Sequence, residues 1–543
     1  MWGLEYLCIM FYRNDSRIPY SGLIIFLLAS LLLLPWLGET LFNSKGEPRE
    51  AIVAVAMIES GDWILPLSYG CDMPFKPPMM AWIIAALAEI FNGGHVTVYL
   101  SRLPSALAAI AMIMAGFYWA RQERGDRFAM IFSMVTLTCF EVFRASMACR
   151  LDMLLTAFMV GALYLFYRIH ETPKRRHRAM WLWAWLLLSC ATLTKGPVGA
   201  LLPCMIGGAY FLFRGDRFLP AFGKFIGLAV ASLLLPALWY YAAWLRGGDA
   251  FYDLMMEENL GRLTGTMSYE SHVNPFYYNF ITLAAGLLPW TLIFVGALFL
   301  IRRWRPAPLK PAGMLALTAV ILTVGFYCIP ASKRSVYLLP AYPFVCYAIA
   351  TIVADAKGRR LDVMFSWFFA ILAIIAPVLY VSLLIWPLPG VTLDNPQWYG
   401  YIALAVPLLC GMAWIIRRHD PCTHMMASVW ALYLAYIVCI MPSVLNPRSD
   451  ARLMERIPAD ASTQIYTYAA GHDDYRLFTL NFYYDNRLRS LPADTDTDLL
   501  PSGTIVLSPE PDDLGTLDPD FRWYRLTQRS CDFRHPLVMG VKP

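Results

Sequence analysis

Charged residues are scarce in this sequence of 543 residues. Lys, Arg, Asp and Glu make up 15% of the chain, whereas about 25% is usual in a soluble globular domain. Apolar residues make up 58% of the chain. They form long blocks, of which the clearest are residues 22–36, 225–245, 362–386 and 424–442. This composition excludes an ordinary soluble protein.

Other familiar signals are absent as well. The 12 cysteines include no CxxC pair, so their spacing indicates neither a metal site nor a disulfide framework. The sequence has no internal repeat, no low-complexity segment and no obvious nucleotide-binding loop. The net charge of +5 belongs to short loops between the apolar blocks, so it gives no reason to expect a nucleic-acid partner.

The apolar blocks have the length of membrane-crossing helices. A bilayer core of about 30 Å needs about 20 apolar residues in a helix, and open strands would leave backbone groups unpaired in lipid. The sequence therefore predicts an all-α polytopic membrane protein with about thirteen transmembrane helices. The first block is expected to be retained, because no small-residue cleavage site precedes Gly38. The candidate spans are 21–38, 98–120, 126–143, 151–168, 179–194, 197–213, 221–245, 277–301, 311–329, 336–354, 362–386, 399–416 and 425–443.

Basic residues alternate between the two sides of this predicted topology. Lys and Arg are enriched in cytoplasmic loops, so we place the basic loops in the cytoplasm. These loops carry Arg13 and Arg17, Arg121 to Arg127, Arg168 to Arg178, Arg214 to Lys224, Arg302 to Lys310, Lys357 to Arg360, and Arg417 with Arg418. The opposite side then holds residues 39–97, 144–150, 195–196, 246–276, 330–335, 387–398 and everything after 443.

Two segments on that opposite side are expected to have structure of their own. Within the loop 39–97, residues 47–60 and 77–92 are predicted to form two short helices along the membrane surface. The tail, 444–543, gains Asp, Pro, Ser and Thr and shows strand-like runs at 464–468 and 504–507. We therefore divide the chain into a transmembrane domain, 1–443, and a small soluble α/β domain, 444–543.

Polar residues gather in the same non-cytoplasmic loops, and ionisable groups at membrane depth usually serve a function. Asp152 begins a predicted span, where it is either a helix N-cap or a functional carboxylate. Lys195 lies in a tight hairpin, where its ammonium either extends to the membrane–water interface or binds a ligand. Lys333 and Arg334 are two adjacent cations on the non-cytoplasmic side, which is an exception to the positive-inside rule and indicates an anionic ligand. Together these loops predict a membrane-embedded site for a phosphate-bearing lipid, with acid/base chemistry beside it.

Several short motifs occur in a recognisable order. They are Gly46-Glu47-Pro48-Arg49 with Gly61-Asp62-Trp63, Lys76-Pro77-Pro78 with Trp82, Arg150-Leu151-Asp152, Leu193-Thr194-Lys195-Gly196-Pro197, Glu258-Asn259 with Arg262, and Ser332-Lys333 with Tyr337-Leu338-Leu339-Pro340. In this order the chain resembles the GT-C membrane glycosyltransferases of the protein-mannosyltransferase-like superfamily. It is most similar to the bacterial aminoarabinose transferases that modify lipid A. The resemblance covers most of residues 20–345.

The resemblance implies transfer of one sugar from a polyprenyl-phosphate (undecaprenyl-phosphate) carrier to lipid A or another envelope acceptor. The enzyme would be a multi-pass protein of the bacterial inner membrane with its active site on the periplasmic side. By position, Glu47 and Asp152 would be the catalytic carboxylates. The donor phosphate would be bound by Lys76, Lys195, Arg262, Lys333 and Tyr337. Contacts to the acceptor or sugar would come from Arg49, Glu258, Asn259 and His272.

The chain departs from the family pattern at two positions. The family usually carries Asp-Glu in the first loop, where this chain has Gly46-Glu47. The aminoarabinose transferases carry a metal-contacting Glu just before the Lys-Pro pair, where this chain has Phe75. No metal ligand is therefore assigned, and no cofactor is expected with certainty.

Other interpretations remain open at this point. The chain could glycosylate protein hydroxyls, as protein O-mannosyltransferases do, or it could move a lipid-linked sugar across the membrane. A transporter would usually show inverted repeats and interrupted spans, and the sequence has no such repeats. The sequence leaves open the sugar, the acceptor, the oligomeric state and the role of the tail.

Overall fold

The structure is a computed structural model. It describes residues 18–74, 76–173, 177–258, 273–300, 309–355, 359–387, 393, 395–416, 420–460, 462–468, 476–492, 495, 497–509, 520–532 and 536–543. The chain forms two compact units. The first, which we call the helical unit, consists of Met1–Trp36, Phe75–Met79 and Pro104–Cys439. The second, the tail unit, consists of Leu37–Pro74, Met80–Leu103 and Ile440–Pro543.

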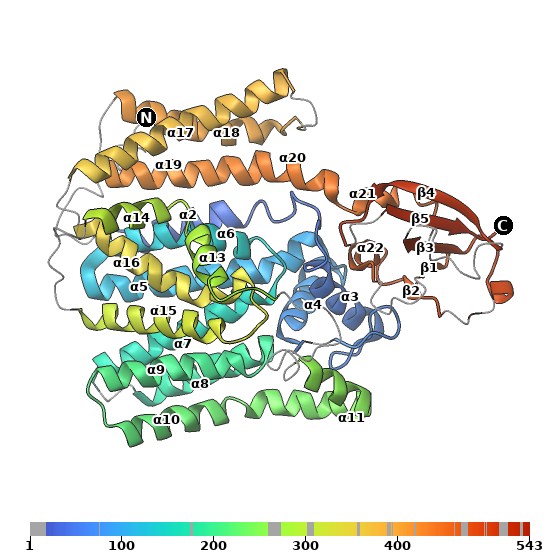
Figure 1. Ribbon diagram of the computed structural model, residues 1–543, viewed down its shortest axis with the longest axis horizontal. Helices are drawn as coiled ribbons and strands as arrows, with labels where there is room; N and C mark the ends of the chain where they lie inside the picture. The colour runs from blue at the N-terminus through green and yellow to red at the C-terminus, as the bar shows by residue number, and fades with distance from the viewer. Residues whose placement is uncertain are drawn as a thin grey trace. The chain divides into compact units, whose positions relative to one another are not determined.

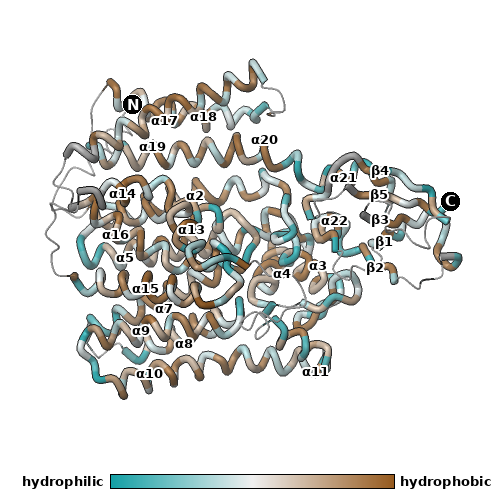
Figure 2. Tube along the Cα trace, viewed as in Figure 1, coloured by the Kyte–Doolittle hydropathy of each residue, from teal (hydrophilic) through white to brown (hydrophobic). Residues whose placement is uncertain are grey.

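The helical unit is built from long apolar helices, many of which run side by side (Figure 1). Hydrophobic residues follow these helices along their length (Figure 2). One group contains α7, α8 and α9, and another contains α17, α18 and α19. The helices are α2 (Ser21–Leu33), α5 (Val98–Leu137), α6 (Phe140–Ser146), α7 (Leu151–Glu171), α8 (His177–Lys195), α9 (Val198–Phe213), α10 (Phe218–Ala231), α11 (Leu234–Met256), α13 (Tyr278–Gly286), α14 (Thr291–Leu300), α15 (Pro311–Cys328), α16 (Tyr342–Asp355), α17 (Arg359–Ile385), α18 (Trp398–Ile416) and α19 (Pro421–Ala435).

Local sequence explains where several of these helices begin and break. Pro311 and Pro421 occupy first-turn positions of α15 and α19, where the missing N–H of proline costs nothing. Asp420 caps α19 by accepting a hydrogen bond from the backbone N–H of Thr423. Within α5, Gly125 has φ 79° and divides the helix in two. This break separates the predicted spans 98–120 and 126–143.

The predicted fold class is confirmed: the chain is a mostly helical membrane protein with a small C-terminal sheet. In the described part of the chain, eight helical segments are long and apolar enough to cross a membrane. They are Val98–Leu137, Leu151–Glu171, Phe218–Met256, Pro311–Cys328, Ser335–Ala354, Val363–Ile385, Trp398–Ile416 and Pro421–Arg448. The predicted spans 21–38, 197–213 and 277–301 coincide with shorter or broken helices, and 179–194 coincides with α8, which is not among the eight segments. The count of thirteen therefore stays a prediction.

The tail unit combines a five-stranded sheet with short helices. The strand order is β2-β1-β3-β5-β4, with β1 parallel to β2 and β3, and β5 antiparallel to β3 and β4. The two strand-like runs of the sequence correspond to β1 and β3. The strands are β1 (Ile465–Thr467), β2 (Arg489–Ser490), β3 (Ile505–Pro509), β4 (Arg522–Arg529) and β5 (Pro536–Val541), and the helices are α3 (Pro48–Ser60), α4 (Met79–Asn92), α20 (Met441–Leu445), α21 (Ala451–Met454) and α22 (Phe478–Tyr483).

The first long loop belongs to the same compact unit as the tail. Its two expected helices are α3, which begins at Pro48 and ends before Gly61 (φ 68°), and α4. The sequence division at residue 443 had separated this loop from the tail. The loop joins the tail because its Tyr69 is buried in the hydrophobic core that the tail's sheet and helices form.

Two carboxylates of the tail unit, the buried Asp450 and the half-buried Asp532, make its stability depend on pH. Asp532 accepts hydrogen bonds from the backbone N–H and the hydroxyl of Thr479, both 2.8 Å long. Asp450 accepts one from the backbone N–H of Cys531 at 2.7 Å. Burial, followed by repulsion from Asp450, raises the pKa of Asp532 to about 7. The folded chain therefore holds a proton that the unfolded chain releases near pH 4.

We expect the melting temperature of the purified full chain in detergent to fall as the pH rises from 5 to 8. The Asp532→Asn variant should show a flatter pH profile, because it removes the titrating group. A wild-type profile that rises across this interval, or an unchanged slope in the variant, would contradict the assignment.

Candidate active site

A carboxylate and an ammonium meet where two neighbouring helices of the helical unit end. Asp152 lies in the first turn of α7, and Lys195 is the last residue of α8. The Lys195 ammonium donates a hydrogen bond to the Asp152 carboxylate, and the two side chains are only 16% and 12% exposed. The N-cap position of α7 belongs to Arg150. The structure thus places Asp152 in a buried ion pair rather than in the capping role that the sequence also allowed.

Aromatic and cationic side chains surround this pair. The Lys195 ammonium lies 4.4 Å from the centre of the Tyr337 ring, and the Tyr337 ring lies 5.3 Å from that of Tyr327. Arg150 and Arg334 lie close enough to Asp152 to act on its charge. The sequence prediction that Asp152, Lys195 and Tyr337 share one site is therefore supported by direct contacts.

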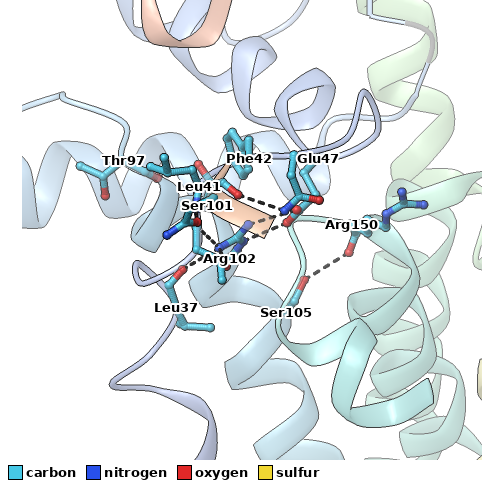
Figure 3. A network of polar contacts seen from close by, with 12 residues as sticks. Leu37, Leu41, Phe42, Glu47, Thr97, Ser101, Arg102, Ser105 and Arg150 are labelled. Atoms are coloured by element: carbon cyan, nitrogen blue, oxygen red, sulfur yellow. Dashed lines mark hydrogen bonds and ion pairs between the residues drawn. The ribbon is translucent and has the colours of Figure 1, made fainter. Parts of the chain in front are cut away.

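The backbone around Asp152 is held by α5. The Ser105 hydroxyl donates a 3.2 Å hydrogen bond to the carbonyl of Arg150, two residues before Asp152 (Figure 3). Ser105 is itself fully buried. This contact fixes the turn that leads into α7, so it limits how far the carboxylate can move.

The adjacent cations Lys333 and Arg334 have different surroundings. The Lys333 ammonium is buried and donates a 2.6 Å hydrogen bond to the carbonyl of Pro330, while its backbone carbonyl accepts one from Asn274. The Arg334 Nε is buried and has no hydrogen-bond partner in the part of the chain that the structure describes. The predicted role of Lys333 at the donor phosphate stays a prediction.

A second ion pair joins Lys76 to Glu258. The Lys76 Nζ lies 2.7 Å from Glu258 Oε2, and the side chains are 15% and 5% exposed. Glu258 follows the end of α11, beyond the break at Gly248 (φ 58°). Both residues were predicted for the site, Lys76 toward the donor phosphate and Glu258 toward the acceptor or sugar. The structure brings them together, and both belong to the helical unit.

Three other predicted residues, Arg262, Asn259 and His272, lie outside the described residues, as does Phe75. Their predicted roles stay predictions.

Glu47 belongs to the tail unit, where a buried arginine binds it. The Arg102 guanidinium donates hydrogen bonds of 2.9 and 3.1 Å to the two carboxylate oxygens of Glu47 (Figure 3). Arg102 also donates to the carbonyls of Leu37 and Thr40, at 2.9 and 2.6 Å. Both charged side chains are buried. Arg49, the other predicted residue of this loop, lies in the first turn of α3.

This network gives Glu47 a structural contact that the sequence analysis missed. Arg102 ties the beginning of the first loop to the start of α3, since it bridges Leu37, Thr40 and Glu47. The signal in the sequence was Arg102 itself, an arginine inside a predicted span, because such residues are costly in lipid and need a partner. Glu47 and Asp152 are thus both held in ion pairs, and their predicted catalytic roles stay predictions.

Comparisons with known proteins indicate the class of the protein. Residues 75–241 match the family described as dolichyl-phosphate-mannose-protein mannosyltransferase. A relative from Aeromonas salmonicida, the undecaprenyl phosphate-alpha-4-amino-4-deoxy-L-arabinose arabinosyl transferase, is 25% identical over 78% of this chain and 79% of its own. An uncharacterized protein of Aquifex aeolicus is 25% identical over 82% of this chain and 83% of its own.

The fold also matches a solved structure. The crystal structure of ArnT from Cupriavidus metallidurans bound to undecaprenyl phosphate has a TM-score of 0.73 and 21% identity, and the match covers 96% of this chain and 98% of that one. The chain is a membrane glycosyltransferase of the GT-C fold. The resemblance given by the sequence motifs is confirmed. Three residues of the glycosyltransferase's candidate site, Lys76, Asp152 and Lys195, lie inside the segment that matches the mannosyltransferase family.

The contribution of the buried Arg102–Glu47 ion pair to the stability of this glycosyltransferase can be tested by double substitution. Removing one partner of a buried ion pair costs about 3–5 kcal/mol, whereas replacing both by apolar groups costs much less. We expect Arg102→Met to lower the melting temperature more than the double variant Arg102→Met with Glu47→Met.

The matched control is Glu171→Gln, because Glu171 pairs with Arg214 where both side chains are about a quarter exposed, at 25% and 28%. Such a pair contributes at most about 1 kcal/mol. If the double variant folds and keeps near-normal sugar transfer, the Glu47 carboxylate has no part in the chemistry. A double variant less stable than Arg102→Met would contradict the assigned pairing.

Proposed function

We propose that this glycosyltransferase transfers a single sugar from undecaprenyl phosphate, or a similar polyprenyl phosphate, to lipid A or another envelope acceptor. The observation that carries the proposal is the buried pair of Asp152 and Lys195 beneath the Tyr337 ring. In this proposal, Lys195 binds the donor phosphate and the Asp152 carboxylate beside it serves the acceptor. The named activity of the Aeromonas relative and the lipid bound in the Cupriavidus structure support this choice of donor.

Electrostatics explain how this site would take a phosphate. Lys195 is bound to Asp152, and Lys76 is bound to Glu258. A phosphate that binds either ammonium competes with the carboxylate already there. Arg334 supplies further positive charge near Asp152, so the site can accept an anion without an excess of negative charge. Donor binding would thereby loosen Asp152 from Lys195 and leave its carboxylate available for the acceptor.

The reaction then follows from these positions. The acceptor oxygen attacks C1 of the sugar while the bond between C1 and the phosphate oxygen breaks, and the electron pair leaves with the polyprenyl phosphate. Cations at the phosphate stabilise the negative charge that develops on it. A hydroxyl acceptor gives its proton to Asp152, whereas a phosphate acceptor is already ionised and needs only positioning. Direct displacement inverts the configuration at C1.

The position of the site along the helices supports a periplasmic orientation. Asp152 begins α7 and Glu171 ends it, so the two residues are about 30 Å apart along the helix axis. Near the far end are Arg168 on α7, and Arg214, which pairs with Glu171. Because cytoplasmic loops collect basic residues, we assign the end with Asp152 to the periplasmic side of the inner membrane.

A protein acceptor is the second candidate, because the matching family is described as transferring mannose to protein. The two functions differ in which cell component loses sugar when the gene is deleted. Mass spectrometry of lipid A and of secreted proteins from the deletion strain would separate them. Movement of labelled donor across the membrane without any glycosylated product would instead indicate a transporter.

Substitution at the central ion pair should separate binding from turnover. We expect Lys195→Met to weaken the binding of undecaprenyl phosphate about 10- to 100-fold, because it removes a charged hydrogen-bond donor. We expect Asp152→Asn to retain or tighten this binding while lowering turnover about 100-fold or more. Both are measured on the full chain in lipid nanodiscs, with Glu171→Gln as a control at the opposite end of α7.

Near-normal turnover of Asp152→Asn, at normal expression and melting temperature, would remove this carboxylate from the mechanism. Unchanged lipid binding by Lys195→Met would show that the phosphate binds elsewhere.

A further inference from the structure

Residues of the tail bind the loop that leads to Lys76 through several contacts. Tyr69, in the middle of this loop, is 1% exposed and is part of the tail's hydrophobic core with Leu477 and Leu480. Its ring meets that of Phe478 edge-on, with the ring centres 6.0 Å apart. A loop residue this deeply buried in the tail ties the two segments together, although they are 400 residues apart in sequence.

The backbone of the loop is held as firmly as the ring. The backbone N–H of Tyr69 donates a 3.0 Å hydrogen bond to the Asn486 side-chain oxygen, and the Asn486 amide donates to the carbonyl of Leu67. Tyr69 has φ 56° and Gly70 has φ 79°, a left-handed conformation that is costly for tyrosine. Asn486, itself buried, therefore recognises a specific turn of the loop.

An ion pair also joins the loop to the tail. The Arg476 guanidinium donates to both carboxylate oxygens of Asp72, at 2.6 and 3.0 Å, and it lies 5.3 Å from the centre of the Tyr69 ring. The bidentate geometry fixes the direction of Asp72 as well as its distance. We call Tyr69, Asp72, Arg476 and Asn486 the loop clip.

The tail also holds the beginning of the same loop. The Tyr483 hydroxyl accepts a 3.1 Å hydrogen bond from the backbone N–H of Phe42, and the Asn446 side chain accepts one from Leu41 at 2.8 Å. The segment from Leu41 to Asp72 is thus anchored near both ends by residues of the tail.

The connection from the clip to Lys76 is short and rich in proline. Lys76 follows Asp72 by four residues, which span at most about 14 Å. Pro74 precedes Lys76, and Pro77 and Pro78 follow it. Proline fixes its own φ and restricts the residue before it. The connection therefore has fewer free backbone torsions than an ordinary segment of this length, and a displacement of Asp72 is expected to shift Lys76 as well.

We propose that the C-terminal domain is a positioning element for the donor site, which acts through the loop clip to hold Lys76. The proposal rests on the proposed function in one respect, namely that Lys76 binds the donor phosphate. The clip residues are positioning residues, since their contacts are with the loop and the tail core. This gives the tail a role in sugar transfer.

Charge reversal provides the test in the full chain. We expect Asp72→Arg and Arg476→Asp, each alone, to raise the KM for the polyprenyl-phosphate donor at least 10-fold, with a smaller change in kcat. Amide hydrogen exchange at residues 76–82 should also become faster. The double variant restores an ion pair of opposite direction, so it should return the donor KM to within about 3-fold of wild type and slow the exchange again.

Asp460→Asn serves as the matched control. Asp460 is an exposed tail carboxylate that binds Ser462 and Thr463 of its own turn, so its loss perturbs the tail but not the clip. We expect neither the donor KM nor the exchange at residues 76–82 to change in this variant.

The outcomes separate the clip from the proposed function. Unchanged exchange at residues 76–82 in both single variants would overturn the clip, whether or not the protein transfers sugar. Faster exchange with an unchanged donor KM would overturn the positioning role while the proposed function stands. A wild-type chain that transfers no sugar would refute the proposed function, and unchanged binding of undecaprenyl phosphate in the single variants would then refute positioning of the donor site.

Discussion

A largely buried ammonium needs a negatively charged partner, and this requirement explains the contact between Lys195 and Asp152 at the candidate site. Lys195 ends one apolar helix and Asp152 begins its neighbour, and each satisfies the other where water is scarce. Neither charge could stay there alone, since an isolated ion in a low-dielectric environment is very costly. Under the proposed function, the donor phosphate competes with this carboxylate for Lys195, so donor binding and the stability of the unliganded site involve the same contact.

The other charged residues of the chain follow the same physical requirement, with different consequences. Arg102 binds Glu47 in the tail unit, so the carboxylate that the sequence motif indicates as catalytic is held in a buried ion pair. Lys76 binds Glu258, so a carboxylate expected to face the substrate is matched with a cation. Arg476 binds Asp72 and connects the loop to the tail core. Each pair brings together residues that are 55 or more positions apart.

Sequence motifs selected residues that the structure brings together, while the individual roles stay predictions. Asp152, Lys195 and Tyr337 were expected to share a site, and the structure places them in contact. Lys333 and Arg334 could not be distinguished from the sequence, since they are adjacent and carry the same charge. In the structure Lys333 binds a backbone carbonyl, while the Arg334 side chain lies where it acts on Asp152. The direction of each side chain depends on the turn before Ser335, which no periodicity in the sequence specifies.

The sequence by itself determined the class of the protein, the course of its long helices and two of the strands of its tail, β1 and β3. These features depend on composition and local period: a bilayer selects apolar runs of about 20 residues, and strands select short β-branched and aromatic runs. Only the tertiary structure decided which charges pair and that the first loop joins the tail. Those outcomes depend on which distant segments pack together, and Tyr69 becomes a core residue only when a sheet 400 residues later forms around it.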